Sequence, residues 1–390
     1  TTVMRAPRTY TREDVVEINC HGGRQPLTRV LRLLLAAGAR LASPGEFTKR
    51  AFLNGRIDLA QAEAVADIVR AKTDMSLAVA MRGLDGRLSA AVAGLRDRLV
   101  AVLAHLEATV DFADEHIEPL TKTEAAQGAA ALAEELETLL ATGAMGRIYR
   151  EGLAVSLCGR PNVGKSSLLN ALLGQNRAIV TPLPGTTRDL IEESIEVGGV
   201  CMRLQDTAGV RRPRDMAEEE GVARSRASLA AADIRLIILD SGEPLRSDDV
   251  QLLDAHAGEG AVVVLNKIDA ALGIDEHAVR ELAKGSSVCR VSALDGAGLA
   301  ELRDALVRSA FSGLSGEPED VLVANARHRQ ALSLGLDRLR EAIRGLQADG
   351  AEEVVAVSLR ECLDSLGEIS GETTGEDVLD RIFSDFCIGK

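Results

Sequence analysis

Residues 159 to 166 have the types and the spacing of a phosphate-binding loop. They read Gly-Arg-Pro-Asn-Val-Gly-Lys-Ser, which fits the pattern G-x-x-x-x-G-K-[ST]. Glycines let backbone N–H groups turn inward around the β- and γ-phosphates, while Lys165 supplies positive charge and Ser166 offers a hydroxyl to Mg²⁺. An apolar run, 154–158, precedes the loop, and a leucine-faced helix follows it. The predicted phosphate contacts come from six neighbours: Asn162, Val163, Gly164, Lys165, Ser166 and Ser167.

A second polar group, Asn266-Lys-Ile-Asp269, follows another apolar run, 261–265. The Asp269 carboxylate can accept both the N1–H and the exocyclic amine of guanine. Adenine has an acceptor at N1 and no 2-amine, so a buried acceptor left unpaired against it would cost about 1–3 kcal/mol. The sequence therefore predicts GTP as the ligand. The base side of the predicted site comprises Asn266, Lys267, Asp269, Ser292 and Ala293, the last two following an apolar run at 287–291.

The tetrapeptide 206–209 follows a predicted β-hairpin, 191–197 and 200–205, with a Gly-Gly turn. Asp206 can hold the Mg²⁺ shell, and the Gly209 N–H can meet the γ-phosphate and sense its loss. All four residues belong to the predicted GTP site: Asp206, Thr207, Ala208 and Gly209.

A Gly-Thr-Thr loop at 185–187 lies between the phosphate loop and the hairpin. A threonine in this position completes Mg²⁺ coordination in switch-type GTPases. Thr187 is the first choice for this ligand, beside Ser166, and Thr186 is the alternative.

The attacking water needs a polar group to orient it. Val210 stands where Ras-type GTPases carry a glutamine, and valine cannot do this. The next acidic cluster is 218–220. Either one of its glutamates orients the water, or the cluster only stabilises the N-terminus of a helix through its negative charge. The arginines around this cluster form the most basic neighbourhood in the chain. They indicate either a contact with RNA or protein, or a solvated surface.

The composition limits the function classes. The chain has 390 residues, is 46% hydrophobic and carries a formal charge of −14. The negative charge argues against a protein that coats nucleic acid non-specifically, although a local basic patch could dock one structured RNA. No apolar run approaches transmembrane length, and six widely separated cysteines without a C-x-x-C pair favour a reducing cytoplasm.

Helical periodicity flanks the predicted GTPase domain on both sides. Residues 59–110 predict one long amphipathic helix, and the boxes Thr121–Glu124 and Thr373–Glu376 predict two helix starts. Residues 1–55 mix two short strands with a helix and are too few for a core of their own. The sequence predicts an α/β Ras-like P-loop GTPase domain inserted into an all-α helical bundle. The predicted domains are 1–55, 56–150, 151–316 and 317–390, the second and fourth forming the bundle.

These features together resemble the MnmE (TrmE) family of tRNA-modification GTPases, over essentially the whole chain. Its most specific parts are Pro44-Gly-Glu-Phe-Thr-Lys-Arg-Ala-Phe-Leu-Asn54 with Asp58-Leu-Ala-Gln-Ala-Glu63, the loop Gly185-Thr-Thr-Arg-Asp189, and the ending Cys387-Ile-Gly-Lys390. The resemblance implies that residues 1–55 are part of an α+β folate-binding and dimerisation domain, the rest of which lies outside this sequence.

The resemblance also implies a homodimeric GTPase that works with an FAD-containing partner, MnmG, in a heterotetramer or larger complex. Such an enzyme installs an aminomethyl-type group (carboxymethylaminomethyl) at C5 of the wobble uridine of certain tRNAs. The one-carbon unit comes from 5-formyl- or 5,10-methylenetetrahydrofolate. By motif, Glu17, Arg56 and Lys390 would contact the folate, and Cys387 would lie beside it as a possible reactive thiol.

Finally, the resemblance implies that K⁺ replaces an arginine finger and supplies positive charge to the transition state. Glu218 would orient the water, with Glu219 and Glu220 as alternatives. The implied K⁺ ligands are Asn162, Thr181, Leu183 through its carbonyl, and Thr186.

The alternative function is a GTP-switched assembly factor for ribosomal RNA or another scaffold. Such a factor should carry a basic RNA-binding module, and none is visible in the sequence.

Overall fold

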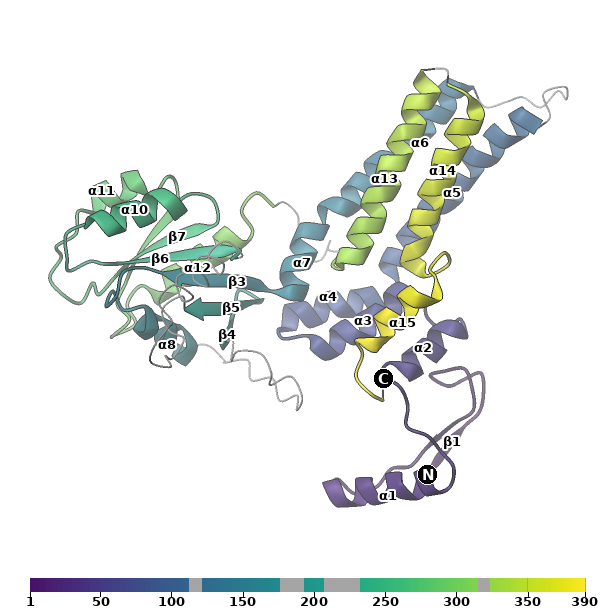
Figure 1. The fold of residues 1–390 in the computed structure, drawn as a ribbon, viewed down its shortest axis with the longest axis horizontal. Helices are drawn as coiled ribbons and strands as arrows, with labels where there is room; N and C mark the ends of the chain where they lie inside the picture. The colour runs from purple at the N-terminus through teal and green to yellow at the C-terminus, as the bar shows by residue number, and fades with distance from the viewer. Residues whose placement is uncertain (112–120, 176–192, 207–231, 315–322, 349, 390) are drawn as a thin grey trace, which may run out of the picture. The chain divides into compact units, whose positions relative to one another are not determined.

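The structure is a computed structural model that describes residues 1–111, 121–175, 193–206, 232–314, 323–348 and 350–389 (Figure 1). The chain forms two compact units. The first comprises 1–71, 78–143 and 321–390, and the second comprises 72–77 and 144–320. The second unit thus interrupts the chain of the first, as expected for an inserted domain. The predicted domain boundaries, which give domains of 1–55, 56–150, 151–316 and 317–390, stay predictions.

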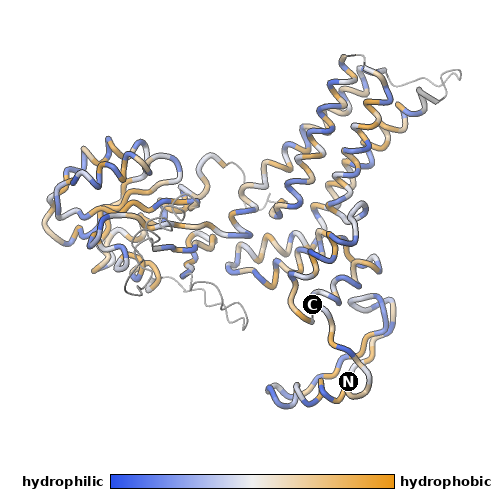
Figure 2. The backbone as a smooth tube through the Cα atoms, in the orientation of Figure 1, coloured by the Kyte–Doolittle hydropathy of each residue, from blue (hydrophilic) through white to orange (hydrophobic). Residues whose placement is uncertain are grey.

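The second unit contains a six-stranded sheet of order β4-β5-β3-β6-β7-β8. Its strands are β3 (Leu153–Cys158), β4 (Glu193–Val197), β5 (Val200–Asp206), β6 (Ile234–Asp240), β7 (Ala261–Asn266) and β8 (Ser287–Val291). All neighbours run parallel except the hairpin β4–β5. Figure 2 shows hydrophobic residues concentrated along the sheet, because central parallel strands are covered on both faces. This topology confirms the predicted α/β fold.

Among the described residues, the helices that accompany the sheet in the chain are α7 (Gly143–Glu151), α8 (Lys165–Gln175), α10 (Ser247–His256), α11 (Glu276–Leu282) and α12 (Leu299–Ala310). Ligands of open α/β sheets bind outside the carboxyl ends of the strands, where the chain order reverses. Here β3 lies between β5 and β6, so the loop after β3 occupies that point.

The first unit contains a helical bundle. Its helices are α3 (Leu59–Arg70), α5 (Arg87–Asp111), α6 (Lys122–Ala141), α13 (Ala326–Gln347) and α14 (Glu352–Ser370). Helix α13 packs on α6 and α14, and α14 packs on α5, so the core joins segments on both sides of the insertion (Figure 1). Leucine and alanine dominate this core. Within the described ranges, no helix combines the length and the apolar character that crossing a bilayer requires.

The single long helix expected over 59–110 is wrong. The segment forms α3, α4 (Asp74–Leu84) and α5. Gly86, with a left-handed φ of 76°, separates α4 from α5, because this conformation ends a helix. The apolar repeat from Leu88 onward belongs to α5 alone.

The two predicted capping boxes have different outcomes. Thr121 and Glu124 form the expected reciprocal bonds at the start of α6. Thr373 does not cap α15 (Glu376–Ser384), which follows Gly375 and has no side-chain cap. Instead, Thr373 Oγ1 donates to the Asp364 carbonyl of α14 at 2.8 Å. Tertiary packing has therefore redirected this hydroxyl away from the local motif.

The N-terminal segment contains the hairpin β1 (Thr2–Met4) and β2 (Val15–Glu17), then α1 (Arg24–Ala36) and α2 (Glu46–Leu53). The predicted strands and helix are confirmed, yet no residue of α1 is buried. By contrast, α2 and the residue after it are tied to the loop between β1 and β2. The Tyr10 hydroxyl lies 3.0 Å from Thr48 Oγ1, and Asn54 Nδ2 donates to the Thr11 carbonyl at 2.7 Å.

A buried ionic cluster joins the two halves of the bundle. Glu63 of α3 is 8% exposed, and both of its carboxylate oxygens accept from Arg327, at 3.0 and 2.6 Å. His328 Nε2 lies 2.7 Å from Glu63 Oε2, and Arg327 also donates to the Ile369 carbonyl at the end of α14. Burial raises the pKa of Glu63, but the hydrogen bonds from His328 and Arg327 outweigh it and lower the pKa to about 2.

Substituting Glu63→Gln should lower the free energy of unfolding by about 3–5 kcal/mol, because Arg327 would keep a buried charge without its partner. The measurement is urea unfolding of the full chain, followed by circular dichroism. The matched control is Glu135→Gln, which breaks a half-exposed pair with Arg98 and should cost about 0–1 kcal/mol. Equal losses of stability in both variants would contradict the conclusion that the buried Glu63 pair stabilises the fold more than an exposed pair does.

The same pair predicts a pH dependence. Because the folded pKa of Glu63 lies below the ordinary value of 4.5, its contribution to stability is present above pH 4.5 and is lost as the pH falls towards 2. The stability difference between wild type and Glu63→Gln should therefore shrink over that range.

Candidate nucleotide site

The loop after β3 has the backbone of a phosphate cradle. Gly159, Asn162 and Gly164 have φ values of 155°, 66° and 94°. A Cβ at Gly159 would lie 2.4 Å from the Ile238 carbonyl oxygen, and one at Gly164 would lie 2.3 Å from Asn266 Nδ2. Side chains are thus excluded from both positions, as a loop that presents its backbone to phosphates requires.

Lys165 begins α8 and is 7% exposed. Its ammonium group donates to the carbonyl oxygens of Gly159 and Arg160, at 2.9 and 2.8 Å. The lysine therefore spans the loop and brings a positive charge to the helix N-terminus, where the backbone dipole also favours an anion. Ser166 and Ser167 follow in the first turn, and both are exposed.

Asn266 connects the phosphate loop to the base side of the site. It is 1% exposed, and its Nδ2 donates to the Val163 carbonyl at 2.8 Å. Its Oδ1 accepts from the Ala293 backbone N–H at 3.2 Å. One side chain at the end of β7 thus holds the loops that follow β3 and β8.

Three further hydrogen bonds complete the base side. Ser292 Oγ donates to Asp269 Oδ1 at 2.6 Å, which holds the carboxylate predicted to recognise guanine. Lys267 Nζ donates to the Asn162 carbonyl at 2.7 Å and to Asp240 Oδ2 at 2.6 Å. The structure therefore brings together the described residues that the sequence predicted for the phosphates and the base.

Sequence reasoning missed Asp240 and Ser241. Asp240 ends β6 in register with Asn266 of β7, and both the backbone N–H and Oγ of Ser241 donate to the Asn266 carbonyl, at 2.9 and 2.6 Å. The sequence did contain a signal for Asp240. An acidic residue ends one apolar run, and another apolar run ends in Asn-Lys.

Several predicted site residues lie outside the part of the chain that the structure describes. They are Thr181, Leu183, Thr186, Thr187, Thr207, Ala208, Gly209, Glu218, Glu219, Glu220 and Lys390. Asp206 ends β5 and pairs in register with Leu157 of β3. Its backbone therefore lies at the same edge of the sheet as the phosphate loop.

The residues expected around folate lie in the first unit. Glu17 ends β2 opposite Thr2. Arg56 donates to the Thr9 carbonyl, and its guanidinium carbon lies 5.3 Å from the centre of the Tyr10 ring. Arg56 thus follows α2, and its side chain packs on the loop between β1 and β2.

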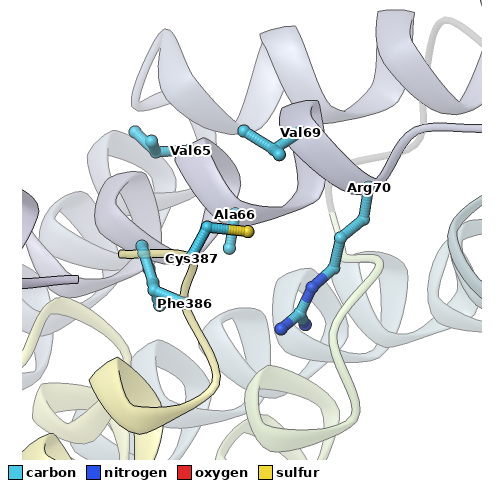
Figure 3. A pocket seen from close by; sticks show the side chains of 6 residues that line it. All are labelled: Val65, Ala66, Val69, Arg70, Phe386 and Cys387. Carbon is cyan, nitrogen blue, oxygen red and sulfur yellow. The ribbon is translucent and has the colours of Figure 1, made fainter. Parts of the chain in front are cut away.

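Cys387 lies on the C-terminal segment, whose backbone meets the Pro44–Gly45 segment. The Gly45 N–H donates to the Cys387 carbonyl at 3.3 Å, and Pro44 forms a β-bridge with Ile388. The thiol belongs to a small pocket against α3, shown in Figure 3, whose lining residues are Val65, Ala66, Val69, Arg70, Phe386 and Cys387. Two segments from opposite ends of the sequence therefore meet here.

Comparison with known proteins adds family information. Residues 1–56 match the family profile described as GTP-binding protein TrmE N-terminus, and residues 59–387 match the MnmE helical domain. The chain is 47% identical over 389 residues to the tRNA modification GTPase MnmE of Bacillus velezensis, covering 100% of this chain and 85% of that protein. It is 44% identical over 388 residues to the protein of that name from Thermoanaerobacter pseudethanolicus, covering 100% and 84%.

Among solved structures, the G domain of the T. maritima FeoB iron transporter is 29% identical. The match covers 40% of this chain and 98% of that one, with a TM-score of 0.31.

Replacing Asn266 by alanine should lower the free energy of unfolding of the nucleotide domain by about 1–3 kcal/mol, because the buried Val163 carbonyl and Ala293 N–H would lose their partner. Differential scanning calorimetry of the nucleotide-free chain measures the effect. Asn170→Ala, at an exposed position of α8, is the control. A loss as small as that of the control would show that the amide is not structurally required.

Proposed function

Because the chain belongs to the MnmE family of tRNA modification GTPases, we propose that it binds GTP with Mg²⁺ between β3 and β7 and hydrolyses it in the course of tRNA modification. The observation that supports this most is the contact of Asn266 with both Val163 and Ala293. It joins the loops proposed to bind the phosphates and the guanine at one edge of a single sheet.

On the phosphate side, Lys165 is already held at the loop by two carbonyl oxygens, so its charge is positioned before a ligand arrives. Such preorganisation avoids an ordering cost on binding. The proposed Mg²⁺ ligands are Ser166 and Thr187, with Asp206 in the surrounding shell. The metal would neutralise charge on the β- and γ-phosphates. Thr207, Ala208 and Gly209 are proposed to meet the γ-phosphate.

On the base side, Asp269 is the proposed determinant of guanine. The Ser292 hydroxyl donates to Oδ1 of this carboxylate and holds its orientation, while the Ala293 N–H is fixed by Asn266. A carboxylate accepts the two donors of guanine and meets an acceptor on adenine, which penalises ATP.

For hydrolysis, we propose that Glu218 orients the water and that K⁺ supplies the charge of an arginine finger. Its proposed ligands are Asn162, Thr181, Leu183 and Thr186. Asn162 fits this role in one respect: its left-handed φ of 66° places an exposed amide side chain on the phosphate loop. A monovalent cation beside the phosphates stabilises charge that develops in the transition state.

The finer reaction is also a proposal. A homodimer would act with an MnmG-type, FAD-containing partner to build a carboxymethylaminomethyl group on the wobble uridine, from a tetrahydrofolate-borne carbon. Glu17, Arg56 and Lys390 are the proposed folate contacts. The junction of Pro44–Gly45 with Cys387–Ile388 supports a common site, because it brings the N-terminal segment and the thiol of Cys387 into one neighbourhood.

Asp269→Asn should change the nucleotide preference from GTP towards XTP. The amide donates where the carboxylate accepted, so it opposes the guanine 2-amine and complements the xanthine 2-carbonyl. Hydrolysis of GTP and XTP over a range of concentrations measures the change in kcat/KM. Asp275→Asn, at the exposed N-cap of α11, should leave the preference unchanged. Unaltered discrimination in Asp269→Asn would refute the base assignment.

GTP hydrolysis should be much faster in K⁺ than in Na⁺ at equal ionic strength, because K⁺ is the cation proposed to stabilise the charge of the transition state. Single-turnover rates give the comparison, and binding of a non-hydrolysable GTP analogue in both salts separates affinity from chemistry. Equal rates would remove the cation from the mechanism.

A further inference from the structure

Arg160 follows Gly159 in the phosphate loop, and its side chain takes no part in the predicted GTP contacts described above. Its side chain is 12% exposed and makes two ionic contacts. Nε donates to Asp249 Oδ1 at 2.8 Å, and Nη2 donates to Glu243 Oε2 at 3.1 Å. Asp249 belongs to α10 and Glu243 to the segment before it. The side chain therefore connects the phosphate loop to a helix that none of the predicted GTP contacts includes.

The partner is itself fixed in place. Asp249 is 2% exposed, and its second oxygen accepts from the Arg246 backbone N–H at 3.1 Å, in the box that starts α10. A carboxylate in the first turn also gains from the helix dipole. Because both oxygens of a buried carboxylate are used, Asp249 offers Arg160 a rigid anchor rather than a mobile surface charge.

The backbone of the same residue contacts the phosphate-binding lysine. The Arg160 carbonyl accepts from Lys165 Nζ at 2.8 Å, beside the bond from Lys165 to Gly159. The side chain that anchors the loop and the carbonyl that positions the lysine thus belong to one residue. Displacing Arg160 would release both.

We propose that the Arg160–Asp249 ion pair, supported by Glu243, positions the phosphate loop and thereby sets the affinity for GTP. The inference rests on the proposed GTP site. Arg160 and Asp249 act here as positioning residues. Without the pair, the loop samples more conformations when empty, and GTP must order it on binding. Turnover of bound GTP depends on other groups, so it should change little.

The test is the pair of variants Asp249→Asn and Arg160→Gln in the full chain. Each should raise KM for GTP and the dissociation constant of a non-hydrolysable GTP analogue by about tenfold, the effect of ordering roughly one additional residue on binding. The value of kcat should stay within about twofold of wild type. Two variants are needed because Asp249→Asn could also weaken the start of α10. The double variant should be no worse than the weaker-binding single variant, because both remove one interaction.

The matched control is Arg246→Gln, which breaks an exposed pair with the same Glu243 and leaves the Asp249 bond intact. It should keep the KM of wild type. The thermal midpoint of each nucleotide-free protein is the second readout. If both test variants keep the KM of wild type and lose only thermal stability, the pair is structural and the inference is overturned. A wild-type chain that binds no GTP would overturn the proposed function as well.

Discussion

The side-chain amide of Asn266 forms hydrogen bonds with two backbone groups that lie far apart in the sequence of the nucleotide domain. It donates to Val163 in the phosphate loop and accepts from Ala293 after β8. At 1% exposure no solvent can replace these bonds, so the three loops hold one another in place. The geometry of the candidate site depends on this constraint, which the bond from Lys267 to the Asn162 carbonyl reinforces, because these side chains join the phosphate cradle to the segment that carries Asp269.

The same principle organises the helical bundle. An inserted domain separates α6 from α13 in the chain, so sequence proximity cannot bring the halves together. The shared apolar core does so, and Glu63 adds an ionic connection through Arg327 and His328, which Arg327 extends to the end of α14. The negative charge thus lies on one half and its cationic partners lie on the other. A buried carboxylate with two cationic partners is costly to disrupt, which makes the association of the halves specific.

The ion pairs with the greatest consequence are those that connect distant elements and are also buried. Arg160–Asp249 and Arg327–Glu63 are largely shielded from water, whereas pairs such as Arg98–Glu135 are half exposed and contribute little. In this acidic chain, the placement of charges therefore matters more than their number. Buried pairs position a loop or join two halves, and exposed ones chiefly keep the surface polar.

The sequence by itself determined the local features. The phosphate loop, the apolar run at 287–291 that forms β8, and the capping box at Thr121 all follow from residues close together in the chain. Glycine at 159 and 164 was informative because backbone geometry and close contacts exclude any side chain there. Only the tertiary structure decided the contacts of Asp240, Arg160 and Glu63, the break at Gly86 and the use of Thr373. These depend on partners brought together by packing, and a local pattern carries no information about which distant groups will be near.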